Sequence, residues 1–438
     1  MPADARPEPA TTRPGGQAST ERADIIVVGG GPIGVCCALE SAQAGARVTL
    51  LEREPEVCPP VSGAYANCGL LAPSDATPLA APGVLGQGLK WMLDSSSPFF
   101  IAPRPSPALM RWLLLFRAAC SRERTRAAAP VLRALHVASA RLHDDLAAVD
   151  GERWGFHHTG ELRVFATTAA LEAAREDVEL GASLGFGIRV EEMGGEHARR
   201  LFPSLRCDLA GALFFPEDGH LDPRRFVRSV ARLATEAGAE VRARAEALSL
   251  GLHGGAVRVQ TTQGTFDADQ VVLAAGAWTP FLTNNLGLRL PIEPAKGYSV
   301  DVDRPTDFPE TPLYLGDAQV VLTPLDDALR LGSTLELSGW DMRVRPRRVA
   351  RLREAAGRAI GIPADGPVRQ LWRGPRPLTP DGLPVIARVP GRERVILATG
   401  HCMLGLSLAP ITGRLVAELA GGKQPSIDLS PLSARRWR

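Results

Sequence analysis

The first strong pattern along the chain is a run of four apolar residues at 25–28. An unbroken apolar run of this kind is typical of a parallel strand that is covered on both faces. A glycine-rich segment follows at 29–34, then an alanine-rich helix to about residue 44, and then a second apolar strand over 46–51 that ends at Glu52. The pattern therefore predicts a complete β-α-β unit.

The rest of the chain alternates between helical and strand-like patterns. Two helices are expected over 107–149, because Leu135, Leu142 and other apolar residues recur there at steps of three and four. Alternation of apolar and polar residues over 240–268 predicts an antiparallel meander. Helices are also expected over 169–184 and 222–237, strands over 161–166, 271–275 and 291–337, and a strand, glycine-rich turn and helix over 395–421.

Composition narrows the class of protein. The 438 residues suffice for two to three domains of roughly 150 residues each, and 45% of them are apolar, as in ordinary globular proteins. Fifty basic and 48 acidic residues leave a net charge of +2, which does not favour a protein that coats nucleic acid. Seven cysteines without metal-type spacing favour a reducing compartment, and no stretch reaches the roughly 18 apolar residues of a membrane span. We expect a soluble, cytoplasmic protein, with residues 1–22 as a disordered tail that carries no secretory or twin-arginine signal.

The glycine-rich segment has the spacing of a dinucleotide-binding motif. Gly29, Gly31 and Gly34 follow a buried strand and begin a helix, and Glu52 lies 23 residues after Gly29. The first glycine permits a tight turn, the second admits a pyrophosphate, and the third lets helix and strand pack closely. The helix N-terminus attracts the phosphates, and the carboxylate accepts hydrogen bonds from a ribose diol. These residues predict a site for NAD or FAD.

Two later segments favour FAD. A second buried strand over 271–275 ends at Gly276 and is followed by Trp278, an arrangement suited to covering the adenosine half of a flavin cofactor. Near the C-terminus, a glycine-rich turn at 400–405 precedes another helix, whose N-terminus suits the flavin pyrimidine.

Arg376, between two prolines, is a candidate for bidentate binding of a carboxylate.

With these motifs the chain resembles the FAD-dependent amino-acid oxidoreductases, which include D-amino acid oxidase, glycine oxidase and sarcosine oxidase. Within that superfamily it is most similar to the bacterial D-amino acid dehydrogenases, and the resemblance runs from about residue 23 to 421. The shared segments are the dinucleotide motif, Ala66-Asn67-Cys68-Gly69, 77–83, Asp218-Gly219-His220, Ala275-Gly276-Ala277-Trp278, Lys296-Gly297-Tyr298-Ser299, 376–382 and the Gly400-His401 turn.

The resemblance implies an α/β, Rossmann-like FAD-binding domain interleaved with an α+β substrate domain on a mainly antiparallel sheet. The FAD-binding domain would comprise 23–82, 222–288 and 371–430, the substrate domain 83–221 and 289–370, and 431–438 a C-terminal tail. The cofactor contacts implied are Gly29, Gly31, Gly34, Glu52, Asn67, Gly69, Gly276, Trp278, Gly400, His401, Met403, Leu404 and Gly405. Sarcosine oxidases attach flavin through a cysteine where this chain has Gly374, so non-covalent FAD is expected.

The activity implied is dehydrogenation of a D-amino acid by hydride transfer to flavin N5, which yields an imine and then a 2-oxo acid. Arg376 would bind the substrate carboxylate, Tyr298 is a candidate second donor, and His401 is a candidate general base. The alternatives are a cis-4-hydroxy-D-proline dehydrogenase, a glycine or sarcosine-type oxidase, and, in a different class, a non-catalytic flavin subunit of a dehydrogenase complex. Ser74-Asp75 stands where such dehydrogenases tend to carry Gly-Tyr, so the substrate's identity stays open.

Partners follow from the same reading. The electron acceptor could be oxygen, a quinone or a partner protein, because no residue distinguishes them. The apolar run 112–116, with Phe99-Phe100 and Trp91-Met92, suggests either peripheral contact with the inner membrane or packing inside the substrate domain. His157-His158 has no carboxylate or cysteine partner at ligand spacing, so a strand edge and no metal are expected.

Overall fold

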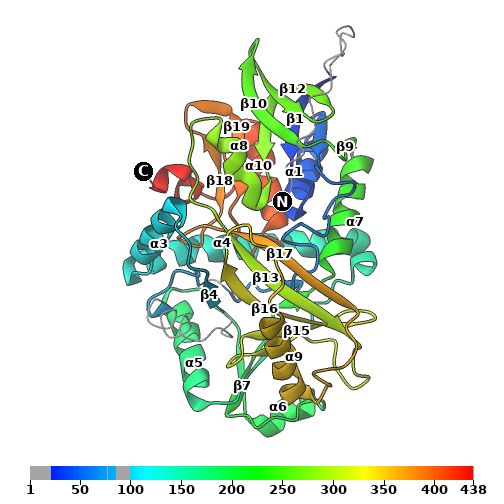
Figure 1. Cartoon of the computed structure of the whole chain (residues 1–438), viewed down its shortest axis with the longest axis vertical. Coiled ribbons are helices and arrows are strands. Elements are labelled where there is room, and N and C mark those ends of the chain that lie inside the picture. Colours follow the sequence, from blue (N-terminus) through cyan, green and yellow to red (C-terminus); the bar gives the residue numbers. More distant parts are fainter. Residues whose placement is uncertain (1–20, 76, 85–98, 438) are drawn as a thin grey trace, which may run out of the picture.

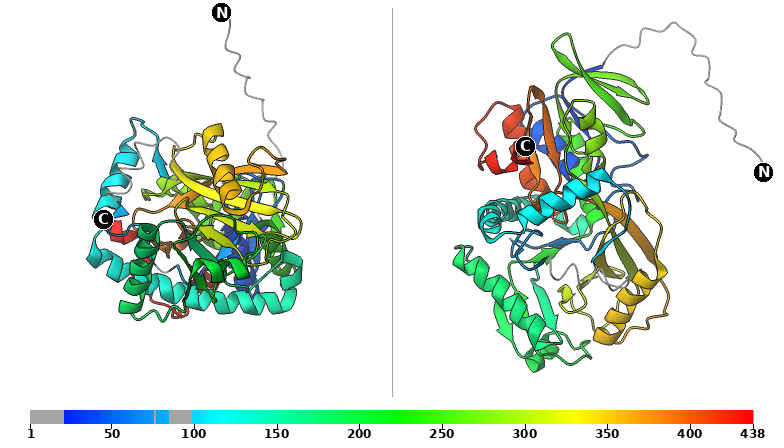
Figure 2. Two further views of the ribbon diagram at one scale, coloured as in Figure 1. Left: turned by 90° about the horizontal axis from the view of Figure 1, so that it is seen from below. Right: turned by 60° about the vertical axis from the view of Figure 1, so that its left-hand side comes forward.

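A computed structural model of the chain describes residues 21–75, 77–84 and 99–437. It has two lobes, each built on a large sheet, with helices α3 (Pro107–Ala119) and α4 (Arg122–Asp150) between them (Figures 1 and 2). Of the tail expected over residues 1–22, residues 1–20 lie outside the described residues, as does the Trp91-Met92 pair, whereas Glu21 and Arg22 are the first residues of a β-strand and not part of a tail.

The first lobe contains the predicted β-α-β unit. Its sheet has the order β10-β11-β12-β1-β2-β9, with β19 also paired to β12 and β18 to β19. The strands are β1 (Glu21–Val28), β2 (Val48–Leu51), β9 (Glu240–Arg242), β10 (Ala247–His253), β11 (Ala256–Thr261), β12 (Gly264–Leu273), β18 (Val385–Val389) and β19 (Arg392–Thr399). The pairings of β1 with β2 and β12, and of β12 with β19, are parallel, as the unbroken apolar runs predict.

Three helices cover one face of this sheet. Helix α1 (Pro32–Gln43) packs between α7 (Pro223–Glu236) and α10 (Ala409–Ala420). Asp222 caps α7, because its Oδ1 accepts a hydrogen bond from Arg225 N at 2.9 Å. The short helix α8 (Thr279–Asn284) follows β12. The Rossmann-like arrangement is thereby confirmed.

The second lobe is built on a mainly antiparallel sheet in the order β17-β13-β16-β15-β14-β5-β7-β6, with β4 added beside β16. Its strands are β4 (Phe99–Ile101), β5 (Glu161–Phe165), β6 (Glu191–Met193), β7 (Gly211–Phe215), β13 (Glu293–Val302), β14 (Leu313–Leu315), β15 (Val320–Pro324), β16 (Leu329–Leu337) and β17 (Gln370–Leu378). Helix α9 (Pro346–Ile360) packs on β13, β15 and β16, while α5 (Thr168–Ser183) and α6 (Gly195–Leu201) pack near β5 and β7. The expected fold class is confirmed.

The chain crosses between the lobes at positions that differ from the domain boundaries expected from the sequence. Strand β17 begins at residue 370 and pairs along its length with β13 of the second sheet, although the interval from 371 was expected in the FAD-binding domain. Helix α4 contributes Leu132 and Leu135, both fully buried, to the core of the first lobe. A two-stranded ribbon of β3 (Leu70–Leu71) and β8 (Gly219–His220) lies apart from both sheets.

The C-terminus and the apolar run also differ from expectation. Leu432 is fully buried and Trp437 Nε1 donates to Asp381 Oδ2 at 3.0 Å, so the last residues pack on the first lobe instead of forming a free tail. In α3, Trp112 and Phe116 are buried and stacked on each other, whereas Leu114 is exposed. Among the helices in the described ranges, none combines the length and the apolar character that crossing a membrane requires.

Candidate active site

A cavity of about 1060 Å³ contains nearly all of the expected cofactor contacts. It is lined by the β1–α1 turn, the end of β2, segment 59–79, the start of η2 (Gly276–Trp278), the turn before α10, and strands of the second sheet. This volume is at the upper end of the range for cofactor and ligand sites. The carboxyl ends of the parallel strands β1 and β2 lie at this cavity, where nucleotide sites of α/β sheets form.

Each of the three motif positions requires glycine for a different structural reason. Gly29 has φ +112°, and a Cβ there would lie 2.7 Å from the Ala274 carbonyl oxygen. Gly34 does not line the cavity, but a Cβ on it would lie 1.8 Å from the Gly29 carbonyl oxygen, so helix and strand pack without room for a side chain. A Cβ on Gly31 would have no neighbour within 4 Å, because it would point into open space at the N-terminus of α1. The turn is thus a cradle for a phosphate group.

Glu52 closes the same end of the cavity. Its Oε2 accepts a hydrogen bond from Gly30 N at 2.7 Å and its Oε1 accepts one from Glu54 N at 2.9 Å. Burial raises the pKa of this carboxyl group, while the two backbone donors oppose the shift. Nearby, Arg53 lies over the Trp278 ring at 4.8 Å, and Trp278 packs against Trp340. Glu52, Gly276 and Trp278 therefore share one end of the cavity.

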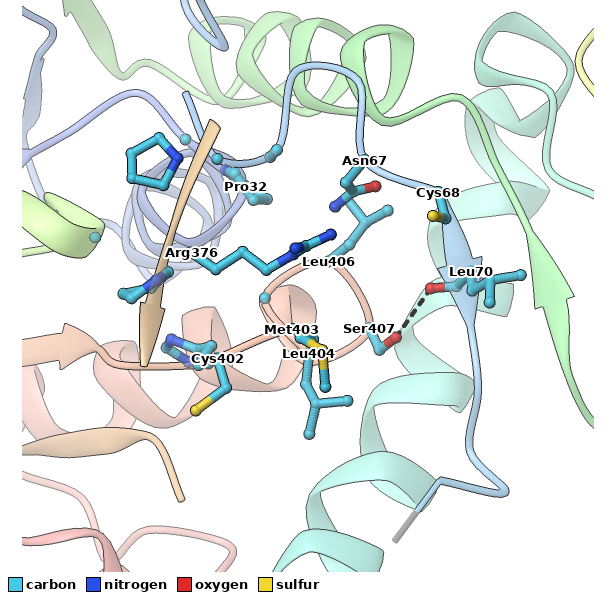
Figure 3. Close-up of a pocket in the computed structure, with 18 of the residues that line it drawn as sticks. Pro32, Asn67, Cys68, Leu70, Arg376, Cys402, Met403, Leu404, Leu406 and Ser407 are labelled. Atoms are coloured by element: carbon cyan, nitrogen blue, oxygen red, sulfur yellow. Dashed lines mark hydrogen bonds between the residues drawn. The ribbon is translucent and has the colours of Figure 1, made fainter. Parts of the chain in front are cut away.

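The wall formed by segment 59–79 is shaped by local hydrogen bonds. Asn67 Oδ1 accepts from Gly69 N at 2.8 Å, and both residues line the cavity. Gly69 has φ +71°, and a Cβ there would lie 2.1 Å from the Leu221 carbonyl oxygen. Ser407 Oγ donates to the Leu70 carbonyl at 3.1 Å and so joins this wall to the turn before α10 (Figure 3).

The turn before α10 brings the remaining expected contacts to the cavity: Gly400, His401, Met403, Leu404 and Gly405. Gly400 has φ +74°, and Cys402 adopts φ +53°, which is unusual for a residue with a side chain. His401 Nε2 is 2.9 Å from Thr412 Oγ1, and burial lowers the pKa of His401 to about 3. Burial therefore makes this imidazole a weak base.

Arg376 is the charged group that enters the middle of the cavity. Its side chain crosses Gly297, where a Cβ would lie only 2.0 Å from Nη1, and Nη1 donates to the Thr334 carbonyl at 2.7 Å. Figure 3 shows the guanidinium directed between Asn67 and the Met403–Ser407 turn. Within the described part of the chain, no carboxylate lies within ion-pair distance of it, and burial lowers its pKa. A guanidinium that is partly buried in a cavity and has no counter-ion is suited to binding an anionic ligand.

Tyr298 is not brought to the cavity. Its hydroxyl donates to Glu336 Oε2 at 3.1 Å on the opposite side of β13 from Gly297 and Ser299. Lys296 is on the same side as Tyr298, with Nζ 3.2 Å from Glu336 Oε1. Because every residue of β13 is buried, the hydrophobic pattern carries no signal for which face of the strand meets the cavity.

The second lobe adds a polar group that the motifs did not reveal. We name it the Arg163 cluster, and its members are Ser74, Asp75, Glu161, Arg163, Asp177 and Asp218. Arg163 Nε donates to Glu161 Oε2 at 2.7 Å, Ser74 Oγ donates to Asp218 Oδ2 at 2.6 Å, and Arg163 Nη1 is 3.6 Å from Asp75 Oδ1. Burial raises the pKa of Glu161, Asp177 and Asp218. Of these residues, the sequence drew attention only to Ser74, Asp75 and Asp218.

Comparison with known proteins gives this geometry a family. The model of the family described as FAD dependent oxidoreductase (DAO) matches residues 24–419. The chain belongs to this family. FAD is its cofactor, and the open Gly31 cradle, the α1 N-terminus and the buried Glu52 fit the ADP half of that molecule.

Individual relatives agree with the assignment. The chain is 33% identical to a D-amino acid dehydrogenase of Cereibacter sphaeroides, over 94% of this chain and 95% of the relative. It is 30% identical to a D-amino acid dehydrogenase of Rhizorhabdus wittichii, over 94% of this chain and all of the relative. Among solved structures, glycine oxidase from Geobacillus kaustophilus superposes with a TM-score of 0.75 at 26% identity, covering 95% of this chain and 99% of the other.

Proposed function

We propose that this FAD-dependent oxidoreductase is a D-amino acid dehydrogenase. The observation that carries the proposal is Arg376, a partly buried guanidinium in the cavity that has no carboxylate partner among the described residues. An α-carboxylate would supply the missing counter-ion in bidentate geometry. The curated relatives named D-amino acid dehydrogenase support the same substrate class.

The chain's own residues would act mainly by binding and orientation. Arg376 would hold the carboxylate, and the buried cavity walls would restrict the substrate to one orientation, which lowers the entropic barrier to reaction. The α-amine must be neutral when the C–H bond breaks, and it would lose its proton to solvent, because the buried His401 imidazole is too weak a base to take it. When bound, FAD supplies the hydride acceptor. The imine product hydrolyses to a 2-oxo acid and ammonia.

The residue assignments at the cofactor belong to the proposal. Gly29, Gly31, Gly34 and Glu52 would hold the ADP half, and Gly276 with Trp278 would lie on the adenosine side. Asn67, Gly69 and the turn residues Gly400, His401, Met403, Leu404 and Gly405 would surround the flavin. Non-covalent attachment is proposed with them, and it is tested by release of free flavin from acid-denatured protein.

The test of function is anaerobic reduction of the FAD-loaded enzyme, followed by the visible flavin absorbance. D-alanine and other D-amino acids should bleach the flavin, and their L-enantiomers should not. Bleaching by glycine or sarcosine but not by larger D-amino acids would instead establish the glycine or sarcosine-type oxidase, the candidate that the glycine oxidase superposition favours. Reduction by cis-4-hydroxy-D-proline alone would establish the proline-analogue dehydrogenase. An enzyme that holds FAD but is reduced by none of these substrates would be the non-catalytic subunit.

The electron acceptor and the location are proposed in the same way. Oxygen, a quinone or a partner protein would reoxidise the flavin, and stopped-flow reoxidation by oxygen and by a soluble quinone separates the first two. We propose a cytoplasmic protein, with peripheral membrane contact through α3 as the alternative. Burial of Trp112 and Phe116 removes much of the apolar surface on which that alternative depends. Flotation of the protein with anionic lipid vesicles would support peripheral membrane contact, and its absence would exclude that contact.

A further inference from the structure

Two histidines and a glutamate that are distant in sequence meet outside the cavity. Ligand atoms of His157, His220 and Glu310 all lie within 4.8 Å of one another. His157 precedes β5, His220 ends β8, and Glu310 lies in the loop between β13 and β14. None of the three lines the cavity described above. The spacing of His157-His158 could not indicate this cluster, because its other members come from separate segments.

His220 is a buried imidazole without a partner. Only 1% of its surface is exposed, and within the described residues neither ring nitrogen makes a hydrogen bond. The Pro324 carbonyl approaches the ring without reaching hydrogen-bond geometry. The His157 ring stacks on it with centroids 5.0 Å apart and planes 17° apart. A buried polar group left unpaired is costly, so an arrangement with two free nitrogens points to a missing partner.

Glu310 supplies the negative charge that such a site requires. Its Oε1 accepts a hydrogen bond from Arg304 at 2.6 Å, and within the described residues Oε2 has no hydrogen-bond partner. The Thr159 hydroxyl donates to the Glu310 carbonyl at 3.1 Å and holds this loop beside the His157 segment. The backbones of His157 and His220 are joined by two hydrogen bonds of 2.9 Å, so the two rings are held on a fixed base.

We propose that His157, His220 and Glu310 bind a divalent transition-metal ion, with Zn²⁺ as the occupant that this ligand set favours. Two imidazoles and a carboxylate, with a water in the fourth position, form a common tetrahedral zinc set. Ligand atoms about 2.0–2.1 Å from zinc lie about 3.4 Å apart in a tetrahedron, so the three side chains close by rotation from their present spacing. The Pro324 carbonyl would accept the N–H of the His220 ring nitrogen that does not bind the metal, which would fix the tautomer of the ring.

The ion would connect the cavity wall to the second lobe. Strand β8 pairs with β3, and Leu221 N donates to the Gly69 carbonyl, so His220 is joined through the backbone to the Asn67–Gly69 wall. Glu310 belongs to the loop that leads into β14 of the large sheet. A metal ion here would therefore stabilise the fold and would take no part in the chemistry.

The test measures zinc binding by the FAD-loaded full chain after treatment with a chelator. Equilibrium dialysis against micromolar Zn²⁺ with elemental analysis should show one zinc per chain, and zinc should raise Tm by the linkage between ligand binding and stability. His157→Ala and Glu310→Gln should each weaken zinc binding at least about tenfold, in the range that loss of supporting ligands produces. Both residues are at least partly exposed, so neither substitution is expected to prevent folding.

His158→Ala is the matched control, because His158 is exposed, adjacent in sequence and outside the proposed ligand set. It should retain zinc and its effect on Tm, and the turnover of all variants without zinc should equal that of the parent. Absence of stoichiometric zinc, or zinc binding that survives both ligand substitutions, would overturn the proposal. Loss of zinc in His158→Ala alone would place the ion at the exposed histidine and overturn it as well.

Discussion

At the residue scale, a charged group in the interior that lacks a partner indicates where a ligand binds. The Glu52 carboxylate is satisfied by two backbone donors, and Arg330, a buried cation, pairs with Asp301 through two bonds of 2.8 Å. Among the described residues, the hydrogen-bond partner of Arg376 is the Thr334 carbonyl alone. Removal of one partner from a buried charge pair is strongly destabilising, so a guanidinium left without one is costly unless a ligand supplies the charge.

Replacement of Arg376 tests this reasoning. Arg376→Ala should lower kcat/KM for D-alanine by about 100- to 1000-fold, since loss of a buried charge contact costs about 3–4 kcal/mol. The effect should appear mainly in KM, while the FAD content stays unchanged. Steady-state kinetics with a dye acceptor measures it. Arg373→Ala is the control, because Arg373 lies in the same strand but is exposed and absent from the cavity wall. Equal kinetics for the two variants would remove Arg376 from the substrate site.

Residues differ in how far the sequence could predict them. Gly29, Gly31, Gly34 and Glu52 were predictable because local spacing along one β-α-β unit determines their geometry. Tyr298 was not, since β13 is buried on both faces and a one-residue step reverses the direction of a side chain. The Arg163 cluster and the pairing of His157 with His220 depend on contacts between distant segments, which no local pattern records.

At the scale of elements, the β1–α1 turn separates binding of the cofactor from packing of the fold. Gly31→Ala should leave unfolding of the apoprotein within about 1 kcal/mol of the parent, because its φ of −79° suits alanine and no atom is near. FAD affinity should fall about tenfold or more, as the methyl group occupies the phosphate cradle. Fluorescence titration of apoprotein with FAD measures the affinity. Unchanged affinity would show that no phosphate approaches this position.

Gly34→Ala is the matched substitution on the same turn, with the opposite expectation. Its Cβ would overlap the Gly29 carbonyl oxygen at 1.8 Å, so the helix must move away from the strand. The apoprotein should lose at least about 2 kcal/mol of unfolding free energy, as overpacked cores do. Urea denaturation of the apoprotein gives this value. A Gly34→Ala protein as stable as the parent would contradict the close packing of α1 on β1.

Helix α4 contributes a pH-dependent contact with the turn before α10. His143 lies in this helix, its Nε2 is 3.2 Å from the Leu406 carbonyl, and burial lowers its pKa from 6.5 to about 4. Above pH 6.5 the ring is neutral in both the folded and the unfolded states. Below that pH the unfolded state binds a proton at His143 and the folded state does not. The free energy of unfolding therefore decreases as the pH falls toward 4.

His143→Gln removes this titration and keeps a donor for the Leu406 carbonyl. Relative to this variant, the parent should lose about 3 kcal/mol of unfolding free energy between pH 6.5 and 4, since each pKa unit is worth about 1.4 kcal/mol. The difference should stay constant between pH 7 and 8. Urea unfolding of both proteins at a fixed FAD concentration measures it. A difference that does not change with pH would show that His143 is accessible to protons in the folded state.

On the scale of the whole molecule, the cavity depends on how the chain crosses between lobes. The sequence predicted two interleaved domains, but not that β17 joins the second sheet or that α4 joins the first core. The hydrophobic patterns of β17 and α4 indicate that these elements are buried, but they do not indicate which neighbouring elements cover them. Strand β17 carries Arg376 into the cavity, so the sheet that it joins determines where the substrate carboxylate that we propose at Arg376 would bind.

That sheet also places the Arg163 cluster at a definite distance from Arg376. The Arg376 guanidinium reaches the Thr334 carbonyl of β16, and β15 and β14 separate β16 from Arg163 on β5. Neighbouring strands lie about 4.8 Å apart, so about 14 Å separates these two strands, and the side chain of an amino acid bound at Arg376 would extend over part of that distance. Asp75, Glu161, Asp177 and Asp218 give the cluster more carboxylates than its single guanidinium balances, even with Asp218 protonated.

The charge of the cluster predicts discrimination against acidic side chains. D-glutamate and D-glutamine have nearly the same shape. The ratio of kcat/KM for D-glutamate to that for D-glutamine should be about 0.1 or lower, because the side-chain carboxylate of D-glutamate would approach like charges. Burial raises the pKa of Asp218 to about 7, so the ratio should fall further as the pH rises from 6 to 8 and this group ionises. Titration of the α-amine affects both substrates equally and cancels in the ratio. Asp75→Asn combined with Asp177→Asn should bring the ratio toward one, and a ratio that these substitutions leave unchanged would show that the substrate side chain points away from the cluster.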